Sequence, residues 1–167
     1  MSEKKKLLVG QVGVANFGAY RRRQMKASGR FELVAVCDRN ADWLSAAAKE
    51  EDAEPYDDFD KMLSHPGLEG VVISTGADSH ARFAVAAMEM GLHVFVEKPL
   101  CCSVKEVEAL RSTQKRTKRV VGLGHNQDRQ VPRRFQRPEV GAQPQAVELF
   151  VRQRHDHQVD HRTGNAH

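Results

Sequence analysis

The chain has 167 residues, of which 40% are hydrophobic and 29% charged, and its net charge is +4 at pH 7. That length suits one ordinary domain and allows roughly two thirds of the unfolded surface to be buried. The charge is too small to indicate nucleic acid or an anionic membrane as a partner, and no apolar stretch approaches the ~18 residues of a membrane span. The three cysteines form no CxxC pair, so we expect reduced thiols, a cytoplasmic location and no metal site.

The first half of the chain alternates apolar runs with helical patterns. Residues 7–12 predict a buried strand that ends at Gly13, and residues 17–28 predict a helix stopped near Gly29. A second strand is predicted over 31–38. After it we expect a helix over 40–52 capped by Asn40, a short strand or turn and then a helical turn within 55–65, and a strand over 69–75.

The same alternation continues to residue 126. A helix is predicted over 79–90, with Phe83, Ala87 and Met90 on one face, and a strand over 93–99 follows. Ser103 and Glu106 form a capping box for a helix over 104–117, whose Val104, Val107 and Leu110 are expected to face inward. The last clear strand is 119–126. Continuously apolar strands that alternate with helices predict an α/β fold with a doubly wound, Rossmann-type parallel sheet.

The composition changes after Asn126. Residues 127–167 contain no Lys, Ile, Met, Cys, Tyr or Trp and are crowded with Arg, Gln and His; only 146–151 reads as a strand. The last sixteen residues have almost nothing to bury, so we expect them to be disordered. The sequence therefore predicts a Rossmann domain over 1–126 and a largely disordered tail over 127–167.

Gly13, Ala15 and Gly18 form a G-x-A-x-x-G loop between the first strand and the first helix. In a dinucleotide-binding loop the first glycine makes the turn, the second allows the pyrophosphate to approach, and the third allows the helix to pack on the strand. Ala15 takes the second position, where its methyl group would displace the pyrophosphate slightly or be accommodated by a small shift. The alternative is an ordinary strand–helix turn.

Asp38 lies 20 residues after Gly18, at the end of the second strand. An acid there accepts hydrogen bonds from the ribose hydroxyls, which favours NAD. The adjacent Arg39 could pair with a 2′-phosphate, which favours NADP. The cofactor is therefore NAD or NADP at this stage, and a surface acid at a strand end remains the alternative for Asp38.

Glu97 and Lys98 follow the strand over 93–99, at the edge where such sheets bind ligands. Lys98 could act as an acid–base group or as a cationic donor to a substrate oxygen, with Glu97 orienting it. The alternative is a surface ion pair. Residues 21–23, three consecutive arginines, are expected to lie on a solvated helical face.

Several motifs in order resemble the N-terminal NAD(P)-binding domain of the Gfo/Idh/MocA oxidoreductase family, over residues 6 to about 126. They are "KLLVGQVGVANFG", "ELVAVCDRN", the long "PYDDFDKMLSHPGLEGVVISTGADSHARFAVAAMEMGLHVFVEKPL" and "RVVGLGHN". The resemblance implies that His80 is the family's histidine after the fourth strand and that Asn126 lies near the substrate pocket. With Lys98 as the catalytic residue, the predicted cofactor-binding residues are Gly13, Ala15, Asn16, Phe17, Gly18, Asp38, Arg39, Ser74, Thr75, His80, Glu97 and Asn126.

The resemblance also implies an activity. In that family the cofactor exchanges a hydride with a sugar- or polyol-like hydroxyl, and a second α/β domain forms the substrate wall. That domain has no counterpart in residues 127–167, so we expect a truncated oxidoreductase with little or no turnover by itself. The alternative is a non-catalytic nucleotide-binding module or a gene fragment without function. Gly76 also departs from the family pattern and is expected to loosen the loop on the adenine side.

Overall fold

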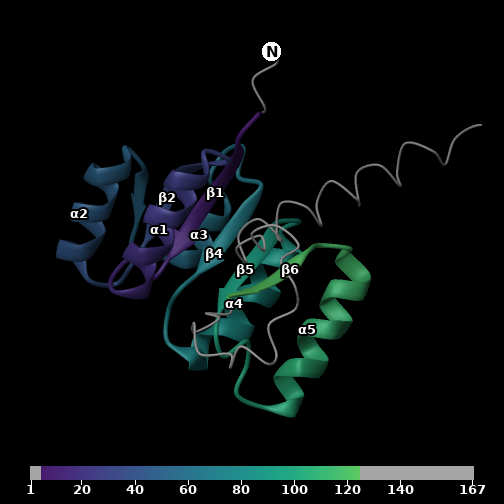
Figure 1. The fold of residues 1–167 in the computed structure, drawn as a ribbon. Helices are drawn as coiled ribbons and strands as arrows, with labels where there is room; N and C mark the ends of the chain where they lie inside the picture. Colours follow the sequence, from purple (N-terminus) through teal and green to yellow (C-terminus); the bar gives the residue numbers. More distant parts are fainter. Residues whose placement is uncertain (1–4, 125–167) are drawn as a thin grey trace, which may run out of the picture.

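The structure is a computed structural model that describes residues 5–124 (Figure 1). Asn126, the tail over 127–167 and the strand expected over 146–151 lie outside the described residues. No helix within residues 5–124 is long and apolar enough to cross a membrane.

One parallel sheet forms the centre of the fold. Its strands lie side by side in the order β3-β2-β1-β4-β5-β6, and every neighbouring pair is parallel. This is the doubly wound Rossmann order, which confirms the predicted fold, and the order reverses between β1 and β4. The strands are β1 (Leu7–Val12), β2 (Phe31–Cys37), β3 (Glu54–Tyr56), β4 (Gly70–Ile73), β5 (His93–Glu97) and β6 (Val121–Gly124).

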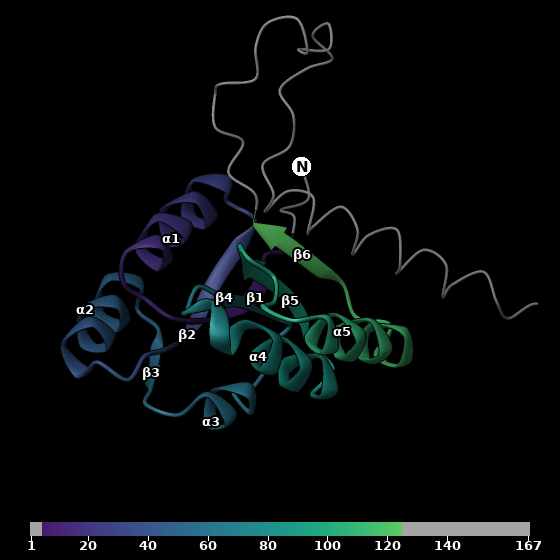
Figure 2. The same ribbon diagram turned by 90° about the horizontal axis from the view of Figure 1, so that it is seen from below.

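Helices cover both faces of the sheet (Figure 2). On one face α1 and α2 pack over residues such as Val9, Val36 and Phe95, and on the other α3, α4 and α5 pack over Val71, Ile73 and Val94. Because successive strand residues point to opposite faces, strands buried on both sides are mostly apolar, with Gln11 of β1 and Glu97 of β5 as buried polar residues. The helices are α1 (Phe17–Ser28), α2 (Ala41–Glu51), α3 (Phe59–Leu63), α4 (Ala77–Glu89) and α5 (Val104–Thr117).

Side-chain caps fix where the helices begin. Asn40 accepts a hydrogen bond from Trp43 N–H (3.0 Å) at the start of α2, and Asp58 accepts one from Lys61 N–H (2.9 Å) at the start of α3. Ser103 caps α5 as predicted. The Glu106 carboxylate, however, accepts from Cys102 N–H (2.7 Å). These caps explain why the predicted bounds of α2 and α5 agree closely with the structure.

Two predicted helix faces are only partly right. In α4, Ala87 is buried as predicted, but Met90 is 55% exposed just beyond the helix, and the buried stripe also holds His80, Ala84 and Met88. In α5, Val104 is 75% exposed and Val107 37%, while Leu110 and Thr113 are buried. α5 packs against α4 and lies towards the β5–β6 edge of the sheet, so it buries only a narrow stripe (Figure 2).

Candidate functional site

A cavity of about 740 Å³ runs along the carboxyl ends of the strands, across the point where the strand order reverses. Parallel α/β sheets bind ligands at this place. Of the predicted site residues, Gly18 and His80 do not line the cavity. Those that line it are Gly13, Ala15, Asn16, Phe17, Asp38, Arg39, Ser74, Thr75, Glu97 and Lys98.

Close packing requires glycine at two positions of the glycine loop. Gly13 has φ of +81°, and a Cβ there would come within 2.7 Å of the Ser74 backbone. A Cβ on Gly18 would lie 2.1 Å from the Gly13 carbonyl oxygen. Neither position can carry a side chain without moving α1 away from the sheet. Ala15 lines the cavity at the middle position, beside the N-terminus of α1, and helix N-termini suit a pyrophosphate.

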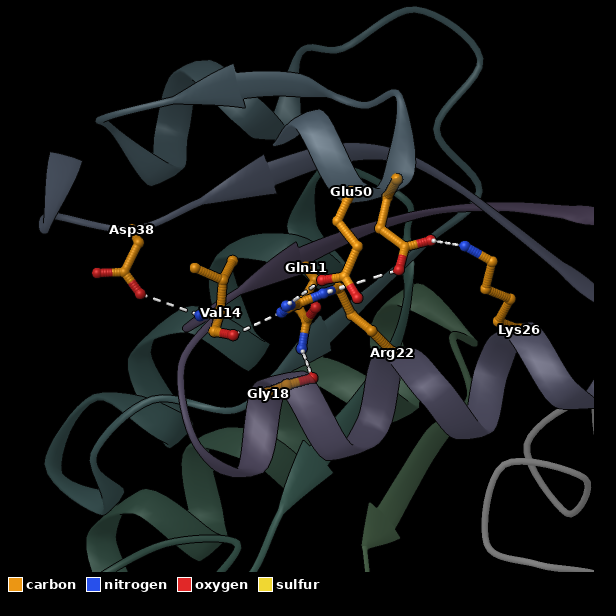
Figure 3. Close-up of polar contacts among 8 residues, drawn as sticks. Gln11, Val14, Gly18, Arg22, Lys26, Asp38 and Glu50 are labelled. Carbon is orange, nitrogen blue, oxygen red and sulfur yellow. Dashed lines mark hydrogen bonds and ion pairs between the residues drawn. The ribbon is translucent and has the colours of Figure 1, made fainter. Parts of the chain in front are cut away.

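Val14, inside this loop, is held from two sides (Figure 3). Its N–H donates to Asp38 Oδ2 (2.9 Å), and its carbonyl accepts a hydrogen bond from the Arg22 guanidinium. Arg22 also donates to Glu50 Oε2 (3.1 Å) on α2. Arg22 is only 6% exposed, so the expected solvated face is wrong for this residue. Its network joins the loop, α1 and α2 into one support.

Asp38 is fixed at the end of β2. Besides the bond from Val14, its Oδ1 accepts from Asn40 N–H (3.0 Å), so both carboxylate oxygens are held by backbone donors. Each oxygen keeps a second lone pair, and the side chain lines the cavity, so Asp38 can still accept a ligand hydroxyl. Arg39, next in the chain, is exposed at the same rim.

The end of β4 carries a polar atom without a partner. Ser74 Oγ is buried and has no hydrogen-bond partner within the part of the chain that the structure describes. It lies in the cavity wall beside Gly13. Because buried hydroxyls are nearly always hydrogen-bonded, this oxygen has hydrogen-bonding capacity that the described residues leave unused.

His80 supports the cavity wall from behind. It is 1% exposed, with Nδ1 2.7 Å from the Pro99 carbonyl oxygen and Nε2 2.9 Å from the Thr75 carbonyl oxygen. It therefore joins the loop after β4 to the segment after β5, where the Lys98–Pro99 peptide is cis. The structure gives His80 a positioning role, and the residue lies outside the lining in which a direct cofactor contact was expected.

At the end of β5, the adjacent side chains of Glu97 and Lys98 have different surroundings. Glu97 is buried and forms an ion pair with Arg21, which is 3% exposed, so the alternative of a surface pair does not hold for Glu97, and the expected solvated position of Arg21 is wrong. The Arg21 guanidinium also lies 5.1 Å from the Phe95 ring centre. Lys98 is exposed, and its Nζ lies 6.0 Å from the centre of the Phe17 ring. Lys98 is thus directed to the cavity mouth without a contact from Glu97.

Sequence reasoning missed the far end of the cavity. Asp57, Asp58 and Asp60, around the start of α3, line it together with Trp43 of α2 and Arg82 of α4. A sequence signal for this end was present: Asp57 directly follows β3, and the carboxyl ends of parallel strands lie at the same edge of the sheet, where the ligand binds.

These carboxylates also act on a buried thiol. Burial raises the pKa of Cys37, at the end of β2, to about 12, and the nearby charges of Asp38, Asp58 and Asp57 add to the rise in pKa. Cys37 itself lines the cavity. Both causes disfavour the thiolate form of Cys37 in the folded protein.

The fold and the site together define a dinucleotide-binding domain: a glycine loop before α1, an acid after β2, and a cavity across the carboxyl edge of the sheet. Residues 7–125 match the Gfo/Idh/MocA oxidoreductase family, NAD-binding Rossmann fold. The chain belongs to this family, as the resemblance implied, and its cofactor class is NAD.

Similar proteins agree with this assignment. Inositol 2-dehydrogenase of Salmonella typhimurium is 33% identical over 122 residues, which make up 71% of this chain and 36% of that protein. The crystal structure of myo-inositol 2-dehydrogenase from Lactobacillus plantarum is 25% identical, with a TM-score of 0.68, over 72% of this chain and 36% of that one.

A third structure shares the fold. It is the WlbA dehydrogenase from Bordetella pertussis, in complex with NADH and UDP-GlcNAcA, at 24% identity and a TM-score of 0.68 over 71% of this chain and 37% of that one. The present chain thus spans little more than a third of the length of these relatives.

Proposed function

We propose that this chain is the dinucleotide-binding part of an oxidoreductase that acts on a sugar- or polyol-like CH–OH group. The observation that carries the proposal is the convergence of the glycine loop, Asp38, Ser74 and Lys98 on one cavity. The relatives that act on inositol support the substrate class.

The residues present suit the two ends of a dinucleotide. The first turn of α1 would hold the pyrophosphate, and Asp38 would accept hydrogen bonds from the adenosine ribose. Ser74 Oγ would hydrogen-bond a polar group of the dinucleotide near the glycine loop. A bound nicotinamide would supply the hydride chemistry. On the other side of the switch point, Lys98 would meet the substrate oxygen, donating a hydrogen bond to it as the ammonium or accepting the hydroxyl proton as the neutral amine.

Dinucleotide binding tests this proposal directly. Asp38→Asn keeps the size of the side chain and one carbonyl acceptor but removes the charge. We expect it to weaken NADH binding by about 1–2 kcal/mol, the scale of a lost hydrogen bond to a charged group. Titration calorimetry on the full chain measures the change.

Asp52→Asn is the matched control, because Asp52 is exposed at the end of α2 in a left-handed conformation that asparagine tolerates. It should bind NADH like the parent. Equal affinity of the Asp38 variant and the parent would show that Asp38 does not contact the ribose.

A second candidate is a nucleotide-binding module without turnover. The position of Lys98 favours it, because this side chain is exposed and its Nζ lies 6.0 Å from the centre of the Phe17 ring. NADH binding without oxidation of any polyol would favour this second function.

A further inference from the structure

Both ring nitrogens of His80 face backbone carbonyl oxygens. Nδ1 lies 2.7 Å from the carbonyl oxygen of Pro99, and Nε2 lies 2.9 Å from that of Thr75. A carbonyl oxygen can only accept a hydrogen bond, whereas a neutral imidazole has one N–H and one bare nitrogen, whose lone pair would point at the second oxygen. Only the imidazolium, with a proton on each nitrogen, makes both hydrogen bonds. The two contacts therefore indicate a positively charged ring.

The other histidines of residues 5–124 have partners that a neutral ring satisfies. His65 Nδ1 lies 3.0 Å from the hydroxyl of Tyr56, which can donate a hydrogen bond as well as accept one. His93 Nδ1 accepts a hydrogen bond from Val120 N–H (3.1 Å), so that nitrogen carries no proton. His80 differs from both in that each of its nitrogens must donate.

The charge on His80 is buried, since the residue is only 1% exposed. A buried cation is tolerated when all its N–H groups are hydrogen-bonded, and hydrogen bonds from a charged donor are stronger than neutral ones. Both N–H groups of the ring meet this condition. The position of His80 near the N-terminus of α4 opposes the charge, and the carboxylate of Asp78 in the first turn of that helix offsets part of this effect.

The carbonyls, not a carboxylate, stabilise the ring. Glu97 of β5 is buried but pairs with Arg21, β4 (Gly70–Ile73) carries no charged residue, and Glu106 of α5 accepts a hydrogen bond from Cys102 N–H. The exposed charged side chains that α3, α4, α5 and the segment after β5 carry at this edge of the sheet are Asp58, Asp60, Asp78, Arg82, Lys98 and Lys105. Because each N–H of His80 is already used by a carbonyl oxygen, none of these groups forms a hydrogen bond with it.

The two carbonyls belong to two different parts of the cavity wall. Thr75 lines the cavity in the loop after β4, and Pro99 directly follows Lys98, which lines it after β5. Both segments lie outside the helices and strands, so no ladder of backbone hydrogen bonds holds them together. A ring with two protons ties both segments to α4, whereas a ring with one proton ties only one of them.

We propose that His80 is held as an imidazolium and is a positioning residue that fixes Lys98 relative to the cavity wall after β4, and that loss of one ring proton uncouples the two segments. The role at Lys98 rests on the proposed function and deepens it, whereas the charge of the ring does not depend on it. A dinucleotide would lie against the Thr75 wall and Lys98 would meet the substrate oxygen, so the ring would fix the group that handles the proton relative to the cofactor.

The protonation of the ring is measured by NMR on the full chain, with its eight histidines labelled on the ring nitrogens. A protonated ring nitrogen and a bare one differ widely in chemical shift. At about pH 7.5, where an ordinary histidine is mostly neutral, we expect two protonated nitrogens for His80 and a bare Nδ1 for His93. The His80 signal is assigned by its absence from His80→Gln or by through-space contacts with Pro99 in the parent. A bare nitrogen on His80 at this pH would overturn the proposal, and the parent alone decides this point.

Two variants test the coupling. The side-chain N–H of asparagine lies near the place of Nδ1 and that of glutamine near the place of Nε2, so His80→Asn keeps the bond to Pro99 and His80→Gln keeps the bond to Thr75. We expect the backbone amide signal of Thr75 to move most in His80→Asn and that of Lys98 to move most in His80→Gln. The control His65→Gln should move neither.

The pH profile gives a readout that packing alone would not change. In the parent, the amide signals of Thr75 and Lys98 should change together with the ring signal when His80 loses a proton at higher pH, and this shared transition should be lost in both variants. Equal changes at Thr75 and Lys98 in the two variants, or a ring transition that neither amide follows, would overturn the coupling. Failure of the parent to bind NADH would refute the proposed function and the role at Lys98, while the measured charge of the ring would stand.

Discussion

At the scale of single residues, the cavity is shaped by side chains whose partners lie elsewhere in the chain. Asp38 and Arg22 hold the two sides of the Val14 peptide from β2 and α1, and His80 joins the loops after β4 and β5. These contacts place the cavity-lining atoms before any ligand arrives. A site fixed in this way needs little reordering on binding.

Cys37 gives a prediction on pH. Its pKa in the folded protein is about 12, against an ordinary value of 9.0, because burial and nearby carboxylates disfavour the thiolate. The unfolded chain therefore loses this proton at lower pH, and unfolding becomes more favourable as pH rises. Above about pH 9 this group should lower the free energy of unfolding by about 1.4 kcal/mol per pH unit.

Urea denaturation of the parent and of Cys37→Ala over this pH range measures the effect. Other groups also titrate there, so the quantity of interest is the difference between the two slopes. The variant should lose stability less steeply than the parent. Parallel slopes would show that Cys37 is not shielded as its surroundings indicate.

At the scale of elements, α1 is fixed to the sheet by a buried ion pair. Arg21 of α1 contacts Glu97 at the end of β5, and a Cβ on Gly124 of β6 would lie 2.8 Å from Glu97 Oε2. Gln11 of β1 adds a bond to the Gly18 carbonyl oxygen (2.9 Å). The pair thus connects the dinucleotide-binding helix with the strand that precedes Lys98.

Breaking this pair should be costly. Arg21→Met or Glu97→Leu leaves one buried charge unpaired, which we expect to lower the free energy of unfolding by roughly 3–5 kcal/mol. The double variant should cost clearly less than the sum of the single variants, because it buries no unpaired charge. Denaturant unfolding of the four proteins measures the coupling.

The exposed pair Arg116–Glu89 is the matched control for these substitutions. Arg116→Met and Glu89→Leu should show little coupling, since both side chains face solvent. Strictly additive effects at Arg21 and Glu97 would mean that the buried pair does not hold α1 to β5.

The sequence predicted the sheet, the bounds of α1 and α5, and the part of the cavity lining around the glycine loop and the ends of β2, β4 and β5, because strand runs, caps and the glycine loop are local signals. It failed where burial depends on distant partners. Arg21 and Arg22 looked solvated, since Glu97 lies 76 residues away from Arg21 and Glu50 lies 28 residues away from Arg22. Val104 and Val107 looked buried, because periodicity identifies an apolar stripe but does not show what lies opposite it.

At the scale of the whole molecule, the two ends of the cavity differ in the number of elements that line them. The end at β2 is lined by residues from β2, α2, α3 and α4 and from the start of α3, including Asp58, Trp43 and Arg82. At the other end Lys98 is exposed, and Phe17 is the ring beside it. Dinucleotide binding and substrate turnover therefore depend on different ends of the cavity. The chain spans 36% of the Salmonella typhimurium inositol dehydrogenase.

We predict that the chain binds NADH but does not oxidise polyols at a measurable rate. Lys98 is exposed in the part of the chain that the structure describes, and water weakens the electrostatic stabilisation that a lysine gives to a reacting oxygen. NADH formation from NAD with myo-inositol or glucose, followed by absorbance, should match the rate without protein. The Salmonella typhimurium inositol 2-dehydrogenase, assayed in parallel, controls for the conditions. Turnover that Lys98→Ala abolishes would show instead that this chain completes its own substrate site.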